Sequence, residues 1–315
     1  MKIKVFPVAY DSFGVRSMAT LVQVNKMNIF IDPGVALGPK RYGLPPTQQE
    51  EKALEISRKN VMKLAKKCKI AIVSHYHYDH HPYPEDDEMY KACFWGKKVF
   101  AKDIKQNINL SGKKRGKIFE SKVKDKAELV YADGKTFELD GILLEFSPAV
   151  WHGDVGSKVG MVIMVYIQKG KHSFLFGSDA QSLADPKALK WVLEKNPEFL
   201  ILDGYPTIFV GWRMAQKSFE KAKQNLKKAV EKVEAKTIIL DHHILRDIDY
   251  KQKMKDVFEL AESLGKKLVS AAEFYGMENL FLEAWRKDIH EGRLQPKVET
   301  FFRKLSRKFK EIKLK

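Results

Sequence analysis

The sequence has very few cysteines and no long apolar run. Only Cys68 and Cys93 occur among 315 residues, and they form no CxxC pair. Neither a disulfide framework nor a zinc site built from thiolates is therefore indicated, and we expect two buried, inert thiols. The best candidate for a long apolar run, residues 161–167, has the length of a strand and falls far short of the roughly 18 residues that a membrane span needs.

Signals for export, repeats and linkers are also missing. The N-terminus lacks an apolar segment followed by a small-residue cleavage site, so we expect a cytoplasmic protein. No internal repeat or long low-complexity linker is visible, and a hydrophobic content of 44% is ordinary for a globular chain. These features favour one catalytic domain over residues 1–295, with residues 296–315 as a basic C-terminal appendage of the same domain.

Acidic residues are too few to balance the basic ones, and the excess is uneven. The formal charge is +17, of which residues 97–126 contribute +8 and residues 296–315 contribute +6. Two basic zones indicate an electrostatic footprint for nucleic acid or another polyanion, but a lysine-rich solvated surface explains them equally well. The partners that this charge suits are an anionic small molecule or a nucleic acid, and the sequence leaves a homo-oligomer open.

The C-terminal basic zone has the pattern of an amphipathic helix. Its apolar residues fall at helical spacing with Lys and Arg between them: Val298, Phe301, Phe302, Leu305, Phe309 and Ile312. Such a helix either docks on the chain's own body or on a dimer partner, or binds an anionic surface.

Turn signals and apolar periodicity predict an α/β chain. We expect strands over residues 4–8, 16–24, 28–31, 70–73, 98–101, 129–131, 136–139, 142–146, 159–168 and 173–176. Thr47 and Glu50 form a candidate capping box for a helix that runs to about residue 67, and the basic segment 103–126 is expected to be mostly helical. Strands 199–202, 237–240 and 267–270 then alternate with helices 186–195, 213–233 and 248–264, which implies a sheet covered by helices.

One stretch stands apart from this ordinary pattern. Residues 74–81 read SHYHYDHH, between an apolar strand and the breaker-rich Pro-Tyr-Pro of residues 82–84. Side chains two apart in an extended segment point the same way, so His75 and His77 can bind one ion, while Asp79 and His80 can serve a second. Imidazole and carboxylate without thiolate suit zinc first, with iron or manganese also tolerated.

Further histidines and aspartates follow other predicted strands. Asp32 lies in an Asp-Pro-Gly turn, Asp179 comes directly after a strand, and His152, His242 and His243 follow or bound loops. Strand ends that share one edge of a sheet bring such loops together. The inventory is sufficient for two divalent metal ions.

The order of these motifs resembles the metallo-β-lactamase superfamily. His75-Tyr76-His77-Tyr78-Asp79-His80, followed by single ligand-like residues after successive strands, matches it over about residues 1–270. The Asp-Pro-Gly turn and the stretch PKRYGLPP at 39–46 resemble an uncharacterised prokaryotic family within that superfamily.

This resemblance implies a four-layer αββα sandwich with two metals at one edge of its sheets. By carry-over, the first metal is held by His75, His77 and His152, the second by Asp79, His80 and His242, and Asp179 bridges them. Asp79 and His242 are also the candidate catalytic residues, and Asp32 supports the histidine loop.

Two histidines need separate interpretation. The segment Asp241–Arg246 is similar to the last motif of the superfamily's transfer-RNA-processing nucleases, which favours His242 over His243 as the final ligand. We expect His81 to support the site from outside or to face solvent.

Two metals about 3.5–4 Å apart can activate water and stabilise the attacking and leaving oxygens of a displacement, which favours hydrolysis. There is no GxSxG motif, and Ser74 is better explained as a strand-end residue.

The basic zones favour a phosphoester or phosphodiester as the substrate. The alternatives are a lactone or thioester hydrolase and a metal-containing nucleic-acid-binding protein without catalysis. Candidate phosphate contacts, each also explicable as solvated surface, are Lys40, Arg41, Arg213 and Arg246. Aromatic residues that either line a pocket or pack around the loop are Trp151, Tyr76, Tyr78 and Tyr205.

Overall fold

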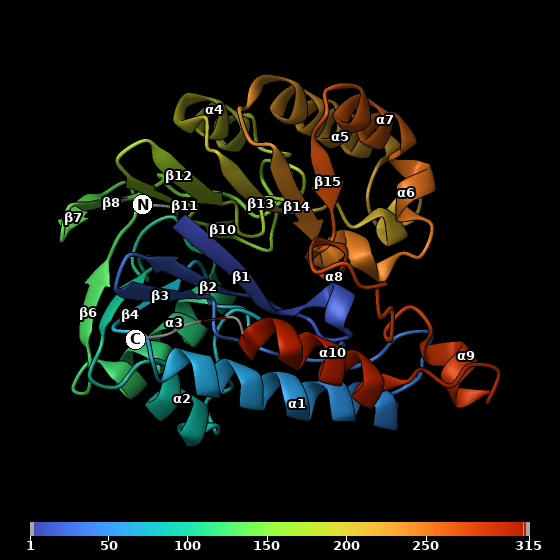
Figure 1. The fold of residues 1–315 in the computed structure, drawn as a ribbon, viewed down its shortest axis with the longest axis horizontal. Helices are drawn as coiled ribbons and strands as arrows, with labels where there is room; N and C mark the ends of the chain where they lie inside the picture. The colour runs from blue at the N-terminus through green and yellow to red at the C-terminus, as the bar shows by residue number, and fades with distance from the viewer. Residues whose placement is uncertain (1–2, 311, 313–315) are drawn as a thin grey trace.

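Two β-sheets lie face to face in the centre of the molecule, and helices cover the outer face of each (Figure 1). The computed structural model describes residues 3–310 and 312. The expected αββα sandwich is therefore confirmed. Within the described residues, no helix combines the length and the apolar character that crossing a membrane requires.

The first sheet contains six strands in sequence order. They are β1 (Ile3–Tyr10), β2 (Met18–Val24), β3 (Met27–Ile31), β4 (Ile70–Val73), β5 (Lys98–Ala101) and β6 (Glu128–Tyr131). The pairs β1–β2 and β2–β3 are antiparallel, and the pairs from β3 to β6 are parallel. Four helices cover its outer face: α1 (Gln48–Ala65), α2 (Asp87–Cys93), α3 (Leu110–Val123) and α10 (Val298–Lys310).

The second sheet has the order β15-β14-β13-β12-β11-β8-β7. Its strands are β7 (Thr136–Leu139), β8 (Ile142–Phe146), β11 (Val165–Lys169), β12 (His172–Phe176), β13 (Phe199–Asp203), β14 (Thr237–Asp241) and β15 (Lys267–Val269). β12 to β15 are parallel, as alternation with helices implies. Their outer face is covered by α4 (Pro186–Lys195), α5 (Gln216–Lys232) and α7 (Lys255–Ser263).

Shorter elements connect these layers and account for most differences from the sequence prediction. They are β9 (Val150–Trp151), β10 (Met161–Val162), α6 (Tyr250–Lys253), α8 (Ala271–Phe274) and α9 (Arg286–His290). The single strand expected over residues 159–168 is wrong: it is divided into β10 and β11, and between them Ile163 N donates to Ser74 O at 3.1 Å. The helix expected over 248–264 is divided at Met254, and α2 was not predicted.

Alternation of apolar side chains divides the core into two clusters. On β12, Phe174 and Phe176 join the core shared with the first sheet, whereas Leu175 joins the cluster under α4, α5 and α7. Successive side chains of a strand point to opposite faces, so a sheet buried on both faces needs such continuous apolar runs. The capping box at the start of α1 is confirmed, because Thr47 N donates to Glu50 Oε2 and Glu50 N donates to Thr47 Oγ1.

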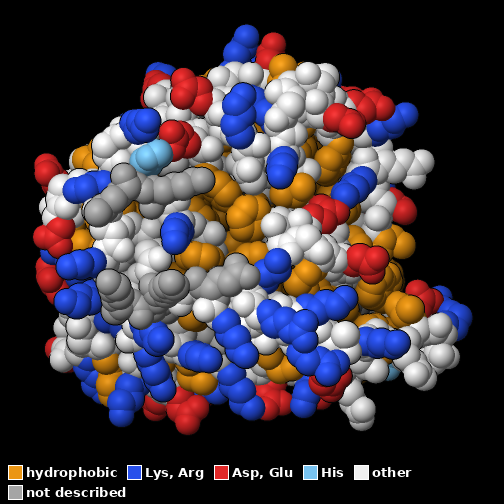
Figure 2. Space-filling model, in the orientation of Figure 1, with side chains coloured by type: hydrophobic (Ala, Val, Ile, Leu, Met, Phe, Trp, Pro, Cys, Tyr) orange, Lys and Arg blue, Asp and Glu red, His pale blue; other side chains and the backbone are white. Residues whose placement is uncertain are grey.

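The C-terminal helix α10 packs on the chain's own body. Val298, Phe302 and Leu305 are buried in the core of the first sheet, and the ring of Phe301 lies 5.7 Å from that of Phe13. The face that carries α1 and α10 is rich in Lys and Arg (Figure 2). Docking on the body accounts for the apolar stripe, while polyanion binding by the basic face stays a prediction.

Both cysteines are free and buried. Burial raises the pKa of Cys68 and of Cys93 to about 12. The thiols therefore stay protonated at neutral pH and react slowly, as the sequence predicts.

Candidate functional site

The histidine loop follows the carboxyl end of β4 and is held in place by Asp32, which follows β3. The Asp32 carboxylate accepts hydrogen bonds from Ser74 N at 2.7 Å, Ser74 Oγ at 2.5 Å and His80 Nδ1 at 2.8 Å. A Cβ at Gly34 would lie 2.3 Å from the backbone N of His81. Only glycine fits there, which explains the Asp-Pro-Gly turn.

The first four candidate ligands converge from three parts of the chain. Ligand atoms of His75, His77, His152 and Asp179 all lie within 4.8 Å of one another. Asp179 Oδ2 is 3.1 Å from His152 Nε2 and 3.5 Å from His75 Nε2. Two of the three imidazoles predicted to share one metal, those of His75 and His152, therefore lie beside one carboxylate oxygen, and His77 belongs to the same cluster.

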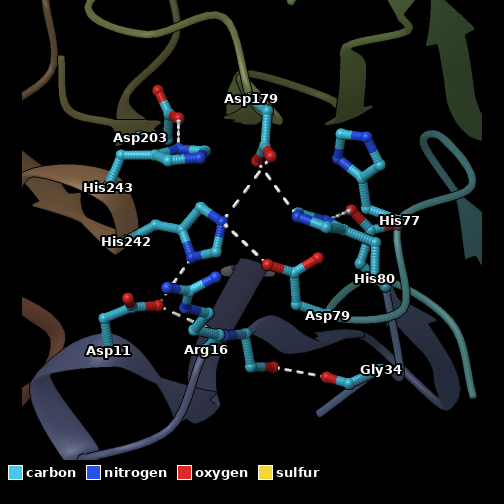
Figure 3. A network of polar contacts seen from close by, with 12 residues as sticks. Asp11, Arg16, Gly34, His77, Asp79, His80, Asp179, Asp203, His242 and His243 are labelled. Atoms are coloured by element: carbon cyan, nitrogen blue, oxygen red, sulfur yellow. Dashed lines mark hydrogen bonds and ion pairs between the residues drawn. The ribbon is translucent and has the colours of Figure 1, made fainter. Parts of the chain in front are cut away.

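The second group is completed by the end of β14. Ligand atoms of Asp79, His80 and His242 also lie within 4.8 Å of one another. Asp179 Oδ1 is 3.1 Å from His80 Nε2, and Asp179 Oδ2 is 3.6 Å from His242 Nε2. Figure 3 shows the Asp179 carboxylate between His80 and His242, facing Asp79. Asp179 thus contacts both groups, as a bridging ligand must.

The donor atoms of this cluster fit metal ions. His80 Nε2, His152 Nε2 and both carboxylate oxygens of Asp179 are buried and have no hydrogen-bond partner outside the cluster; they contact one another at 3.1 Å. Unsatisfied buried polar atoms are costly and rare. Four such atoms that face one another form the arrangement that the ligands of a metal ion need.

The opposite nitrogens of the same rings are held by partners outside the cluster. His80 Nδ1 bonds Asp32, His242 Nδ1 bonds Asp11 Oδ2 at 2.6 Å, and His152 Nδ1 contacts Gln181 Nε2 at 3.3 Å. Metal-binding histidines almost always use their second nitrogen in this way, because it fixes the ring orientation. Asp11 and Gln181 were missed by the sequence reasoning.

Electrostatics favour a cation in the cluster. Burial lowers the pKa of His75 well below its usual value, so its imidazole is neutral, the form that binds a metal. Burial also opposes protonation of His242, but Asp11 and Asp179 outweigh it and raise its pKa to about 10. At His80 burial is likewise outweighed by Asp179 and Asp32, and the pKa is raised. These carboxylates therefore draw positive charge, which a metal ion supplies.

His243 and His81 occupy different places from the second group. His243 has ligand atoms near Asp179 and His242 but is absent from the group that contains Asp79 and His80; its Nδ1 bonds Asp203 Oδ2 at 2.5 Å. This geometry fits the choice of His242. His81 is buried against Phe119 and does not face solvent.

A cavity of about 900 Å³ opens over the cluster. Of the candidate phosphate contacts, Arg213 and Arg246 line it, whereas Arg41 is turned away and donates to Arg246 O at 3.2 Å. Tyr78 lines the cavity, and Tyr205 is buried beside it with its hydroxyl on Asp154. Arg115, from the basic segment, also lines the cavity and was not singled out from the sequence.

Asp32→Asn should lower metal affinity about 10- to 100-fold, the usual effect of losing a partner behind a ligand. Asparagine keeps the shape and tolerates the left-handed backbone at this position, φ 48°, but it removes the charge that orients His80. Competition with a chromophoric chelator measures the affinity. Asp133→Asn, which removes the carboxylate paired with buried Lys102 at 2.5 Å, is the matched control; an equal loss there would contradict a specific role for Asp32.

Comparison with known proteins agrees with this fold. Among solved structures, the metallo-β-lactamase fold protein YhfI of Bacillus subtilis superposes with a TM-score of 0.52 and 12% identity, covering 85% of this chain and 95% of that one. The diiron β-hydroxylase CmlA of Streptomyces venezuelae gives a TM-score of 0.51 and 12% identity over 85% of this chain and 52% of its own. At such low identity these likenesses show the fold alone.

Sequence relatives are much closer. The UPF0282 protein of Pyrococcus horikoshii is 41% identical over 306 residues, covering 95% of this chain and 96% of that protein. The UPF0282 protein of Korarchaeum cryptofilum is 38% identical over 289 residues, 92% and 95% of the two chains. No known family model matches the chain. The solved structures confirm the fold that the sequence resemblance implies, and the sequence relatives show that the chain belongs to the UPF0282 family.

Proposed function

We propose that the protein is a metal-dependent hydrolase that cleaves a phosphoester. The observation that carries this proposal is the cluster of buried imidazole and carboxylate atoms, three of whose residues, His77, Asp79 and His152, line the cavity. Divalent ions bound there would lower the pKa of a water molecule and stabilise charge on the attacking and leaving oxygens.

Each residue of the cluster has a proposed task. His75, His77 and His152 would hold one ion, Asp79, His80 and His242 would hold the other, and Asp179 would contact both. The donor set suits zinc first and tolerates iron or manganese.

Asp79 and His242 remain the proposed catalytic residues because they lie at the junction of cluster and cavity. Asp79 lines the cavity, and its Oδ2 is 3.6 Å from His242 Nε2. Arg246 NH2 is 3.7 Å from the same oxygen and is itself anchored on Asp11 at 2.9 Å. This chain of contacts fixes the Asp79 carboxylate in the orientation that a ligand and a proton acceptor both need.

A phosphoester is favoured over the alternatives by the charge of the cavity. Four arginines line it, against the two carboxylates Asp79 and Asp154. Positive side chains are suited to a nucleotide or nucleic acid substrate, whereas a lactone or thioester has no use for them. We also propose that the protein acts in the cytoplasm, where two free thiols are ordinary.

The test is turnover by metal-loaded protein. We expect at least one tightly bound transition metal per chain by elemental analysis, and hydrolysis of bis(p-nitrophenyl) phosphate, labelled RNA or DNA that Asp79→Ala abolishes. Activity on lactones or thioesters alone would show that the substrate is one of these esters and not a phosphoester. Salt-sensitive binding of nucleic acid without cleavage would show that the protein binds nucleic acid and does not hydrolyse it.

A further inference from the structure

The cavity above the cluster is large enough for an organic molecule. Its volume of about 900 Å³ is at the upper end of the range of small-molecule sites, roughly 300–1,000 Å³. Its wall is built from the histidine loop, α3 and the segments after β9 and β13, together with residues that follow β1, β3, β12 and β14. Substrate selection must therefore come from these regions.

Two of the four arginines in the wall have a carboxylate partner. Arg16 pairs with Glu283 at 2.6 Å, and Arg246 pairs with Asp11 at 2.9 Å. Among the residues that the structure describes, Arg115 and Arg213 form no ion pair and no side-chain hydrogen bond. Their positive charge is free for a ligand.

These two guanidinium groups are held by aromatic rings. Arg115 lies 5.6 Å from the centroid of Tyr78, and Arg213 lies 4.2 Å from that of Trp212. Arg115 Nε is buried and has no hydrogen-bond partner. Cation–π contact orients a guanidinium without using its donors, so the donors remain available for an anion.

Arg115 also adjoins the metal cluster. Arg115 and His77 line the same cavity, and the Arg115 guanidinium lies 5.6 Å from the ring of Tyr78, the residue that follows His77. An anionic group bound by Arg115 would therefore lie beside the first group of ligands.

Exposed apolar side chains gather at the mouth of the same cavity. Tyr83, Val155 and Val159 line it and are 38%, 59% and 44% exposed. Trp212, 63% exposed, contacts the lining residue Phe209 with ring centroids 5.7 Å apart. These are four of the eight large apolar side chains exposed in the described chain. Clustered exposure of this kind marks a binding surface.

We propose that the cavity selects a phosphate ester that carries a planar apolar group. Arg115 and Arg213 bind the charged group, and Trp212 with its apolar neighbours binds the planar group. This inference rests on the proposed function, because it names the substrate class of the same cavity.

Equilibrium binding of phosphonates, which are not hydrolysed, tests the proposal independently of turnover. Zinc-loaded protein should bind phenylphosphonate at least about tenfold more tightly than methylphosphonate. Arg115→Gln and Arg213→Gln should each weaken both ligands about tenfold or more, since each removes charge-assisted hydrogen bonds. Trp212→Ala should remove the preference for the phenyl group, and because it also removes a ring that holds Arg213, it should weaken methylphosphonate binding, but by less than Arg213→Gln does. Titration calorimetry measures all of these affinities.

Lys113→Gln is the matched control. It removes one positive charge from the same helix at an exposed position outside the cavity wall. The change in affinity that it causes therefore measures only the long-range effect of losing one charge. Equal losses in Lys113→Gln and Arg115→Gln, no phenyl preference, or no phosphonate binding by the wild type would overturn the proposal.

The two proposals fail differently. Phosphonate binding that depends on Arg115 and Arg213, in a protein that hydrolyses no phosphoester, would keep the binding site and reject the reaction. Hydrolysis of phosphoesters with unchanged binding in both variants would keep the reaction and reject this site.

Discussion

Asp179→Asn should lose most of its bound metal and lose hydrolytic activity by more than about 100-fold. Removal of a residue that only supports a metal ligand already lowers metal affinity or activity about 10- to 100-fold. Asp179 contacts both ligand groups directly, because its oxygens lie 3.1 Å from His80 Nε2 and His152 Nε2. Asparagine keeps the size of the side chain but supplies one neutral oxygen in place of two charged ones. Elemental analysis of metal per chain, after gel filtration, is the primary measurement.

Asp154→Asn is the control for this variant. Asp154 lines the same cavity and accepts a hydrogen bond from Tyr205 at 3.1 Å, but it belongs to neither ligand group. It should keep the metal content of the wild type. Full metal content in Asp179→Asn, with circular dichroism unchanged in both variants, would show that Asp179 is not a ligand.

The parts of the site that the sequence predicts are those with short-range or chemically unusual signals. Imidazoles at positions 75, 77 and 80 are too concentrated for ordinary surface or core, so their common role is readable from spacing. Asp179 was found because it directly follows a buried strand, and strand ends meet at one edge of a sheet, whereas Asp32 was found by its resemblance to the first motif of the metallo-β-lactamase superfamily. Two of the four candidate clusters among the described residues contain the residues that the sequence predicts for the two metals, and their binding of metal stays a prediction.

Other parts depend on contacts that no local pattern records. Asp11 meets His242 across 231 positions of sequence, and its only local signal is that it follows β1 as Asp32 follows β3. Asp203, behind His243, has the same signal at the end of β13. Arg115 is one of many cations in its segment, and only tertiary packing distinguishes it by turning it into the cavity.

Another such long-range contact is a buried ion pair between α9 and α1. Arg286 and Glu50 have side chains that are 0% and 1% exposed, with Arg286 NH2 at 2.7 Å from Glu50 Oε1. Arg286 also donates to Gly38 O at 2.7 Å and Leu44 O at 3.1 Å. One guanidinium therefore joins the C-terminal segment, the loop before α1 and the capping box at its start.

Arg286→Met should lower the free energy of unfolding by about 3–5 kcal/mol, because the Glu50 carboxylate would remain buried without its partner. The midpoint of thermal unfolding should fall by roughly 6–15 °C at about 2–3 °C per kcal/mol for a chain of this size. Differential scanning calorimetry measures the shift.

Arg58→Met provides the comparison for a pair near solvent. Arg58 pairs with Asp86 at 2.6 Å while its side chain is 28% exposed, and such pairs are worth only about 0–1 kcal/mol. Adding Glu50→Gln to Arg286→Met should recover part of the loss, because the amide retains a carbonyl oxygen for Thr47 N and leaves no buried charge. If Arg286→Met were no more destabilising than Arg58→Met, or if the double variant were less stable than the single one, the buried charge would not be the cause. The loss would then come from the hydrogen bonds to Gly38 and Leu44, and the C-terminal segment would be held chiefly by its backbone contacts.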